Sequence, residues 1–493
     1  MRIGKGIALA WLGLAVAGCG GVQADEAPRP LPVEDSREVT AQACPPGVAS
    51  RVRVVTPPGA TRRDSLAYLT DVQGTLYFIT NLPDEGVVLW RSNGTEAGTV
   101  PVRAFPPGAQ LTDLVAVGPR LFFRAYAPET GTELWISDGT SAGTRLVEDI
   151  TPGGNGSLLS NLSAVNGRLV FFRVVPATPT EAYRLEMWRS DGTAAGTLRV
   201  RNFGDAFELS FRTLQVSDAL LFFLSGETGT TLWRTDGTLA GTTAVKRLDA
   251  GAVPVVAVGR AGNLGLFILD DGPNHEVWRT NGTATGTLRL DAFSRPVGLL
   301  GAVGPYVYLS SVDMDTRRLR IDRLSLGGGG KTAITTLPNP YSQYEFAYPY
   351  VQQTTVSGGE IYFSVAISSE GPAPVDVALW VTNGTATGTR TLFRQLSRND
   401  EYASPVFATG TGVVLFTGSP EGGSTEPWFT RGTAATTGQL ADVYPGPWGS
   451  GADDFTRVGN RVYFSAFDDT SQRQLWSVPA SFTCPPGPTA PQE

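Results

Sequence analysis

A carboxylate or amide side chain recurs beside Gly and Thr residues along the chain, and this pattern carries the most obvious chemistry. Residues 133–144 read ELWISDGTSAGT, and six further segments repeat this sequence with small changes. Ca²⁺ takes six to eight oxygen ligands, several of them carboxylates, so a loop rich in Asp and Thr is a candidate calcium site. The acidic position, however, alternates between Asp and Asn and becomes Arg431 in one copy. A turn tolerates these changes and a carboxylate ligand does not, so we expect hairpin turns and no metal site.

Residues for nucleophilic or acid–base catalysis are few. The chain has one histidine, His275, and it lacks a G-x-S-x-G segment and a metal-spaced histidine cluster. Ser–His–Asp and Cys–His catalysis both need a placed base, which only His275 could supply, and its sequence context predicts a surface loop. Two pairs of acids, Asp270-Asp271 and Asp453-Asp454, are interpreted as solvated turn residues. We therefore expect no catalytic residue and no cofactor.

The ELW segment organises the chain as a repeat. Successive tryptophans of this segment are 45, 53, 45, 45, 102, 48 and 48 residues apart, and residues 320–332 fill the long gap with a degenerate copy that has lost its tryptophan. Self-similarity at this period indicates a propeller or solenoid. The repeated core residues are Trp90, Trp135, Trp188, Trp233, Trp278, Trp380, Trp428 and Trp476.

Each repeat is predicted to contain four β-strands. Aromatic and β-branched runs precede every ELW segment, and four strands with short connections need about 45 residues. Leu134 and Trp135 are adjacent, so they point to opposite faces of a sheet and both faces must be covered, as in a blade stacked between two others. The sequence predicts an all-β propeller of nine blades, or eight if the unit near Arg320 is not a blade; a parallel β-helix is the structural alternative. The turns between third and fourth strands are expected at Asn93, Asp138, Asp191, Asp236, Asn281 and Asn383.

The two ends of the repeat array complement each other. The last unit stops after its third strand, while residues 51–55 match a fourth strand, so this early segment can complete the last blade. Cys44 and Cys484 stand in matching CPPG contexts at the two ends, which predicts a disulfide across the seam in an exported protein. The propeller is expected to span residues 44–484, followed by a disordered tail at 485–493.

The first residues have the pattern of a secretory signal. A basic start precedes a short apolar run and the segment VAGC, which resembles the lipobox of bacterial lipoproteins. Residues 1–19 are interpreted as a lipoprotein signal peptide with lipidation on Cys19, and residues 20–43 as a flexible tether. The expected location is the bacterial cell envelope, with the protein held at the outer membrane or cell surface through the lipidated Cys19. The alternative is an ordinary signal peptide in which Cys19 has no role.

The charge balance argues against one class of partner. The net charge is −7 and no basic patch stands out, so nucleic acid is not an expected partner. The protein is expected to be a monomer.

The repeat resembles a known family. ELWISDGTSAGTRLVEDITPG, residues 133–153, is similar to the signature of the ELWxxDGT-repeat proteins of bacteria, and the resemblance covers nearly all of residues 51–479. It implies an exported β-propeller and no transferable activity. Asn in place of Asp, the tryptophan lost near Leu324 and the segment TRGTAATTG depart from the pattern, which puts the regularity of those blades in doubt.

The segments that do not repeat are the candidates for ligand binding. In a four-stranded blade the signature turns share one rim, and the irregular loops share the other. The longest of these loops, residues 337–350, is rich in tyrosine, which suits protein or carbohydrate recognition; ordinary loop packing is the alternative. The expected function is a non-catalytic binding platform for a protein or glycan, with a carbohydrate-active enzyme using channel acids, or a structural envelope protein, as alternatives. The candidate ligand-loop residues are Tyr341, Tyr344, Tyr348 and Tyr350.

Overall fold

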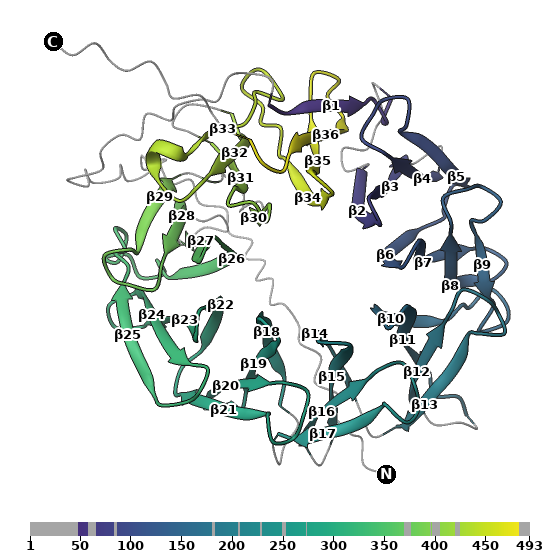
Figure 1. The fold of residues 1–493 in the computed structure, drawn as a ribbon, viewed down its shortest axis with the longest axis horizontal. Helices are drawn as coiled ribbons and strands as arrows, with labels where there is room; N and C mark the ends of the chain where they lie inside the picture. The colour runs from purple at the N-terminus through teal and green to yellow at the C-terminus, as the bar shows by residue number, and fades with distance from the viewer. Residues whose placement is uncertain are drawn as a thin grey trace, which may run out of the picture. The chain divides into compact units, whose positions relative to one another are not determined.

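The fold is described from a computed structural model. It covers residues 48–482, except 58–65, 83–85, 180–182, 206–207, 227–228, 249–252, 273, 369–375, 395, 397–404 and 420–423. Nine four-stranded antiparallel sheets follow one another around a ring, each with its first strand innermost and its fourth outermost (Figure 1). The predicted nine-blade propeller is confirmed, and the degenerate unit near Arg320 forms a complete blade.

Blades 1 to 5 follow the sequence order without exception. Their strands are, for blade 1, β2 (Leu66–Val72), β3 (Thr75–Leu82), β4 (Gly86–Ser92) and β5 (Val100–Phe105); for blade 2, β6 (Leu111–Val117), β7 (Arg120–Ala127), β8 (Gly131–Ser137) and β9 (Arg145–Glu148); for blade 3, β10 (Leu158–Val165), β11 (Arg168–Val175), β12 (Arg184–Ser190) and β13 (Leu198–Gly204); for blade 4, β14 (Glu208–Val216), β15 (Ala219–Gly226), β16 (Gly229–Thr235) and β17 (Thr243–Arg247); and for blade 5, β18 (Val255–Ala261), β19 (Leu264–Asp270), β20 (His275–Thr280) and β21 (Leu288–Phe293).

Blades 6 to 9 continue the ring, and a single 3₁₀ turn, η1 (Ala434–Thr436), replaces the signature turn of blade 8. Their strands are, for blade 6, β22 (Val297–Val303), β23 (Tyr306–Asp313), β24 (Arg318–Ser325) and β25 (Lys331–Thr336); for blade 7, β26 (Pro349–Ser357), β27 (Glu360–Ile367), β28 (Asp376–Thr382) and β29 (Arg390–Arg394); for blade 8, β30 (Phe407–Ala408), β31 (Val414–Gly418), β32 (Glu426–Thr430) and β33 (Gly438–Gln439); and for blade 9, β34 (Asp453–Val458), β35 (Arg461–Phe467), β36 (Arg473–Pro479) and β1 (Ser50–Arg53).

The core is divided into layers between blades. Leu134 packs in the layer that blade 2 shares with blade 3, whereas Trp135 packs in the layer between blades 1 and 2. The adjacent pair thus covers opposite faces of one sheet, as alternation along a strand requires. Inside its own blade Trp135 stacks on Phe123, its cross-strand partner on β7, with the ring centroids 6.4 Å apart.

The ring is closed by the beginning of the described chain. β1 pairs antiparallel with β36, so residues 50–53 supply the outer strand of blade 9, close to the predicted 51–55 (Figure 1). Gln474 of β36 is fully buried, and its side-chain oxygen accepts the backbone N–H groups of Val55 and Thr56 at 2.8 and 3.1 Å. Its amide nitrogen donates to the Thr56 carbonyl at 2.7 Å. A single amide side chain therefore satisfies three backbone groups where the two ends meet.

Truncation of this side chain should open the seam. Gln474→Ala removes the partner of three buried backbone groups, and each buried polar group that loses its partner costs about 1–3 kcal/mol. We expect a free energy of unfolding lower by about 3 kcal/mol or more and faster amide exchange in residues 50–56, measured by denaturant unfolding and hydrogen exchange. Gln110→Ala, at an exposed position, is the control. Equal stability of the two variants would refute this role of Gln474.

Candidate functional site

The signature turns are closed by their own side chains. The Asp138 carboxylate accepts hydrogen bonds from the backbone N–H and the hydroxyl of Thr140, at 2.9 and 2.7 Å. The Thr140 hydroxyl accepts the Gly143 N–H at 2.9 Å, and the hydroxyls of Ser137 and Thr144 lie 2.7 Å apart. These bonds from Thr140 hold the pKa of Asp138 below its usual value. The carboxylate therefore works as an acceptor inside the turn.

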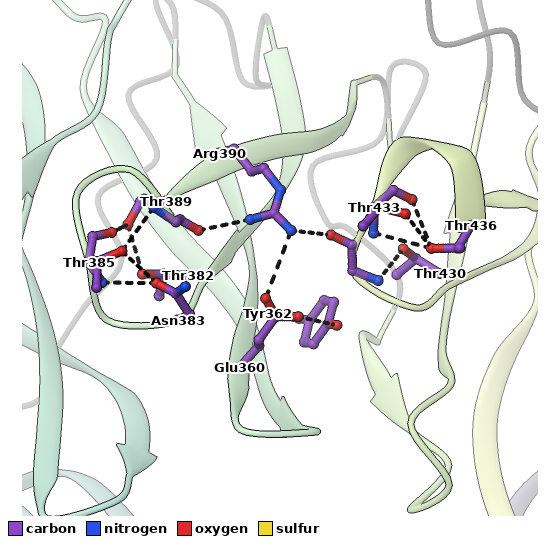
Figure 2. A network of polar contacts seen from close by, with 12 residues as sticks. Glu360, Tyr362, Thr382, Asn383, Thr385, Thr389, Arg390, Thr430, Thr433 and Thr436 are labelled. Atoms are coloured by element: carbon purple, nitrogen blue, oxygen red, sulfur yellow. Dashed lines mark hydrogen bonds and ion pairs between the residues drawn. The ribbon is translucent and has the colours of Figure 1, made fainter.

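The same acceptor role explains the exchange of Asp for Asn. In blade 7 the Asn383 amide oxygen accepts the N–H and hydroxyl of Thr385, at 3.1 and 2.7 Å (Figure 2). In blade 8, where Arg431 occupies the position, the hydroxyls of Thr433 and Thr436 bond to each other at 2.7 Å and close the turn. Within the described residues, no group of three or more His, Cys, Asp or Glu side chains is arranged to hold a metal ion.

Basic residues of the outer strands connect neighbouring blades, a feature that the sequence analysis missed. Arg103 of β5 lies over the Trp135 ring of the next blade at 5.3 Å and donates to the Thr144 carbonyl at 2.5 Å. Arg201 and Lys246 make the corresponding contacts in blades 3 and 4. Blades 2 and 5 have Glu148 and Asp291 at the corresponding position, so a basic residue is not present there at every junction.

The blade 7–8 junction uses a variant of this contact, shown in Figure 2. Arg390 donates to the Gly432 carbonyl of blade 8 at 2.5 Å and lies 3.8 Å from the Glu360 carboxylate. The Tyr362 hydroxyl donates to the same carboxylate at 3.0 Å, and burial with this bond raises the pKa of Tyr362. The rim that carries the signature turns is therefore held together by structural contacts between neighbouring turns.

Two glutamates of the repeat are buried without a cation. Glu133 and Glu426 are 0% and 1% exposed, and each precedes its repeat tryptophan by two residues. Glu133 accepts the Ser157 hydroxyl at 2.7 Å and the Thr151 N–H at 3.2 Å, whereas Glu426 accepts the Val443 N–H at 2.9 Å. Burial raises the pKa of both carboxyls to about 7 despite these bonds. They anchor the segments that lead to the next blade and are closed to solvent.

His275 does not supply a catalytic base. It starts β20 and is half-buried instead of lying in a surface loop. Its Nδ1 accepts the Val297 N–H at 3.1 Å, and its Nε2 lies 3.7 Å from the Asp270 carboxylate. Both ring nitrogens thus face partners of the fold, so neither is left to activate a serine hydroxyl.

The predicted ligand loop borders a cleft. Residues 337–350 join blade 6 to blade 7, and Leu337, Pro338, Pro340 and Pro349 line a cleft between these blades. Of the four predicted tyrosines, Tyr344 and Tyr350 are exposed, and Tyr348 lies under Arg317, whose guanidinium is 5.9 Å from the ring centroid. Burial raises the pKa of Tyr341, and the Asp376 carboxylate adds to this effect.

A second group of polar residues lies on the innermost strands beside the seam. Tyr68, Asp113 and Asp454 come from blades 1, 2 and 9 and have φ of 61°, 55° and 57°, each at a bulge in its strand. The bulge turns these side chains out of the regular alternation. Asp453 and Asp454 begin β34, so their interpretation as solvated turn residues is wrong.

The electrostatics of Asp454 differ from those of the signature acids. Burial raises its pKa, and the neighbouring Asp453 carboxylate raises it further, while Arg473 and a hydrogen bond from the Tyr68 N–H oppose the rise. A proton is therefore retained on Asp454 more readily than on an ordinary aspartate, with a second carboxylate next to it in the chain. Sequence reasoning could identify the two acids but not the left-handed bulge at Asp454.

Several predicted features lie outside the described residues. These are the signal peptide, the lipidation site Cys19, the tether, the cysteines Cys44 and Cys484, and the tail. Within the part of the chain that is described, no helix has the length and apolar character to cross a membrane.

Comparison with known proteins finds similarity among solved structures only. No protein-family model and no curated protein matches the chain. Among solved structures it is similar to a prolyl endopeptidase (13% identity, TM-score 0.42, 74% of this chain and 54% of that one) and to puromycin hydrolase (14%, 0.39, 73% and 60%). It is also similar to the β-propeller domain of the Trilobed protease from Pyrococcus furiosus (13%, 0.35, 65% and 95%). The chain thus spans little more than half the length of the first two proteins.

The prediction of a non-catalytic binding platform is contradicted by this comparison. The similar solved structures include chains described as prolyl endopeptidase or oligopeptidase, puromycin hydrolase and acylaminoacyl peptidase. Any hydrolytic chemistry of this chain has to come from its own residues.

Stability should depend on pH through the buried glutamates. A carboxyl with a pKa of about 7 in the folded protein and about 4.5 when unfolded binds more protons in the folded state between these values. Its stabilising contribution is fully present below pH 4.5 and is lost as the pH rises through 7. We expect the free energy of unfolding to fall by on the order of 2–3 kcal/mol per glutamate between pH 4.5 and 8.

Chemical denaturation across this pH range measures the effect. The double variant Glu133→Gln and Glu426→Gln should flatten the pH dependence, because an amide cannot titrate. Glu129→Gln, at an exposed position in the loop after β7, is the matched control and should leave the profile unchanged. A double variant with the wild-type slope would show that other groups cause the dependence.

Proposed function

We propose that the protein is a hydrolase that acts on peptides, with Asp453 and Asp454 on the innermost strand of blade 9 as the acid–base pair. The observation that carries the proposal is the place of two adjacent carboxyls on an innermost strand, where Asp454 has a φ of 57° at a bulge and where burial and the Asp453 carboxylate raise its pKa. Burial and the adjacent carboxylate favour the protonated form of Asp454 relative to an ordinary aspartate. Acid–base hydrolysis needs one carboxyl that can donate a proton beside a second one that can accept it.

The proposed reaction is the addition of water across a peptide bond. The Asp453 carboxylate takes a proton from water, and the resulting hydroxide attacks the peptide carbonyl carbon. The carbon–nitrogen bond breaks as the carboxyl of Asp454 gives its proton to the departing amine. The products are a carboxylic acid and an amine, and proton exchange with solvent restores the pair. This route needs neither the histidine nor a cysteine, which agrees with the engagement of both ring nitrogens of His275.

Neighbouring side chains suit a peptide substrate. Tyr68 is 40% exposed beside Asp454, and Arg473 lies close enough to lower the pKa of that carboxyl. Trp448, six residues before Asp454 in the segment that enters blade 9, is 72% exposed. An exposed aromatic ring offers contact area for a peptide. Peptidases also occur among the structural neighbours, although that likeness shows the fold alone.

Asp454→Asn removes the transferable proton and should lower kcat by about 100-fold or more with a small change in KM. The measurement is cleavage of a mixed peptide library followed by mass spectrometry, then kinetics on the best substrate. Asp71→Asn, an exposed aspartate that accepts the Gly74 N–H, is the control. Full activity of Asp454→Asn, or no cleavage by the wild-type protein, would refute the proposed pair.

We also propose that the chain is exported and anchored in the bacterial cell envelope through a lipidated Cys19. The VAGC segment and the charged, proline-containing residues 20–43 support the anchor and the tether. The proposal extends to a disulfide between Cys44 and Cys484, to a monomeric state and to membership of the ELWxxDGT-repeat proteins. The pairing of β1 with β36 supports the disulfide, because both cysteines lie a few residues beyond the described seam.

The anchor predicts a specific product. The mature protein purified from native membranes should begin at Cys19 and carry acyl chains, detected by intact-mass and peptide mass spectrometry. Cys19→Ser should shift the protein from the membrane fraction to the soluble fraction while leaving the propeller folded. Wild-type protein with an unmodified Cys19 would contradict the anchor and leave an ordinary signal peptide as the explanation of the apolar run.

A further inference from the structure

One position of the repeat holds a polar side chain against the segment that leads to the next blade. This position is the second residue before the tryptophan, and it is Glu133 in blade 2, Glu426 in blade 8 and Gln474 in blade 9. All three side chains are at most 1% exposed. Each accepts backbone N–H groups, of the connecting segment in blades 2 and 8 and of the seam in blade 9, so the three copies can be compared atom by atom.

Gln474 shows what both polar atoms of this side chain do. Its Oε1 accepts two successive backbone N–H groups, while its Nε2 donates to the Thr56 carbonyl at 2.7 Å and to the Thr470 hydroxyl at 3.0 Å. The position therefore provides partners for one acceptor atom and one donor atom. A carboxylate has only acceptors, so it cannot make the second set of bonds.

Glu133 makes the first set of bonds and lacks the second. Its Oε1 accepts the Thr151 N–H at 3.2 Å and the Ser157 hydroxyl at 2.7 Å. Its Oε2 is buried without a hydrogen-bond partner among the described residues, and so is the hydroxyl of Thr130, which directly precedes β8. An acceptor that is buried without a donor costs free energy. A proton on Oε2 removes this cost, because the carboxyl then donates as Nε2 of Gln474 does.

The charges around Glu133 favour the protonated form. Burial raises its pKa to about 7, and the carboxylate of Asp149 in the connecting segment adds to the rise. Arg173 of β11 also reaches this segment, but its guanidinium donates to the Thr151 hydroxyl at 2.7 Å and forms no ion pair with Glu133. The carboxyl thus has a carboxylate nearby and no cation bound to it.

Blade 8 repeats the arrangement. Asp442 follows Glu426 at the same spacing as Asp149 follows Glu133. Burial raises the pKa of Glu426 to about 7, and the Asp442 carboxylate again adds to the rise. The Val443 N–H donates to Glu426 at 2.9 Å, so this carboxyl also holds the beginning of its connecting segment.

We propose that Glu133 and Glu426 hold their connecting segments as protonated acids, and that loss of the proton releases residues 149–157 and 442–450 while the blades stay folded. An ionised carboxyl has two acceptor oxygens where the fold supplies donors for one, so the segment moves to let water reach the second. Both segments lie on the rim of irregular loops, so the surface of that rim changes with pH. The proposal does not rest on the hydrolytic function, and the seam held by Gln474 should not respond.

Native-state hydrogen exchange at about pH 5.5 and about pH 8 tests the proposal, with protection factors that correct for the faster intrinsic exchange at high pH. The pKa is about 7 with the segment held and returns toward 4.5 on release, so the restraint is present at low pH and is lost as the pH rises through 7. Protection of residues 150–151 and 443–444 should fall by about tenfold or more between these pH values. Residues 55–56, whose acceptor cannot titrate, are the internal control.

Exchanging the side chains between copies locates the effect. Glu133→Gln supplies the donor that Gln474 uses, so residues 149–157 should stay protected at both pH values while residues 442–450 still respond. Gln474→Glu should do the reverse and make the protection of residues 55–56 depend on pH.

The wild-type measurement is decisive even if a variant fails to fold. Protection of residues 150–151 and 443–444 that does not change with pH overturns the proposal. A folded Glu133→Gln variant that keeps the wild-type response at residues 149–157 overturns it as well, whereas Glu129→Gln, at an exposed position, should keep that response. The infrared difference between wild type and Glu133→Gln should contain the band of a protonated carboxyl at low pH, and a carboxylate band there instead would also overturn the proposal.

Discussion

Both faces of each sheet are apolar and must be buried, and this requirement determines the architecture. A strand that carries Leu and Trp at consecutive positions presents large apolar side chains on both faces, and neither face can be left in water. Every blade therefore needs a neighbour on each side, and a linear stack would leave two faces bare. Nine apolar layers between nine blades resolve the problem, because the layer between blades 9 and 1, which contains Val52 and Leu475, has the same character as the others. Closure follows from the composition of one strand.

Polar groups buried by this stacking are satisfied by a few repeated positions. The position two residues before the tryptophan carries Glu133, Glu426 or Gln474, which accept backbone N–H groups of the segments entering the next blade or the seam. In blade 3 the same position, Glu186, instead gathers three arginines. The repeat thus keeps the place of an acceptor and varies its partner. Residues in these positions stabilise the ring, and the reactive candidates lie elsewhere, on the bulged inner strands and on the longest loop.

Much of the fold followed from the sequence because the information was periodic. The spacing of the tryptophans predicted blades, and the missing fourth strand of the last unit predicted the seam to within two residues. The exchange of Asp for Asn among the repeats predicted that the signature forms turns. The candidate sites were harder to predict. The left-handed conformation of Asp454 belongs to a bulge in β34 that no local pattern records. The contact of Arg103 with Trp135 joins residues of neighbouring blades, and their proximity is not visible in a single repeat. The tyrosine-rich loop was visible as composition, but the ion pair beside it joins strands β28 and β29 to a cleft that only the packed ring creates.

The pairing of β1 with β36 also sets the order in which the blades and the seam can form during folding. The first described strand finds its partner only after more than four hundred further residues have been made. Blades can form locally as the chain lengthens, because their hairpins close short loops. The seam joins the two ends of the described chain, so the entropy cost of closing this long loop arises last. Until then β1 has no partner, and the bare faces of the first blade and of the newest blade remain available to other chains. In the finished ring the seam edge is paired. The open precursor is an aggregation-prone intermediate, and it persists until the final strand pairs with β1.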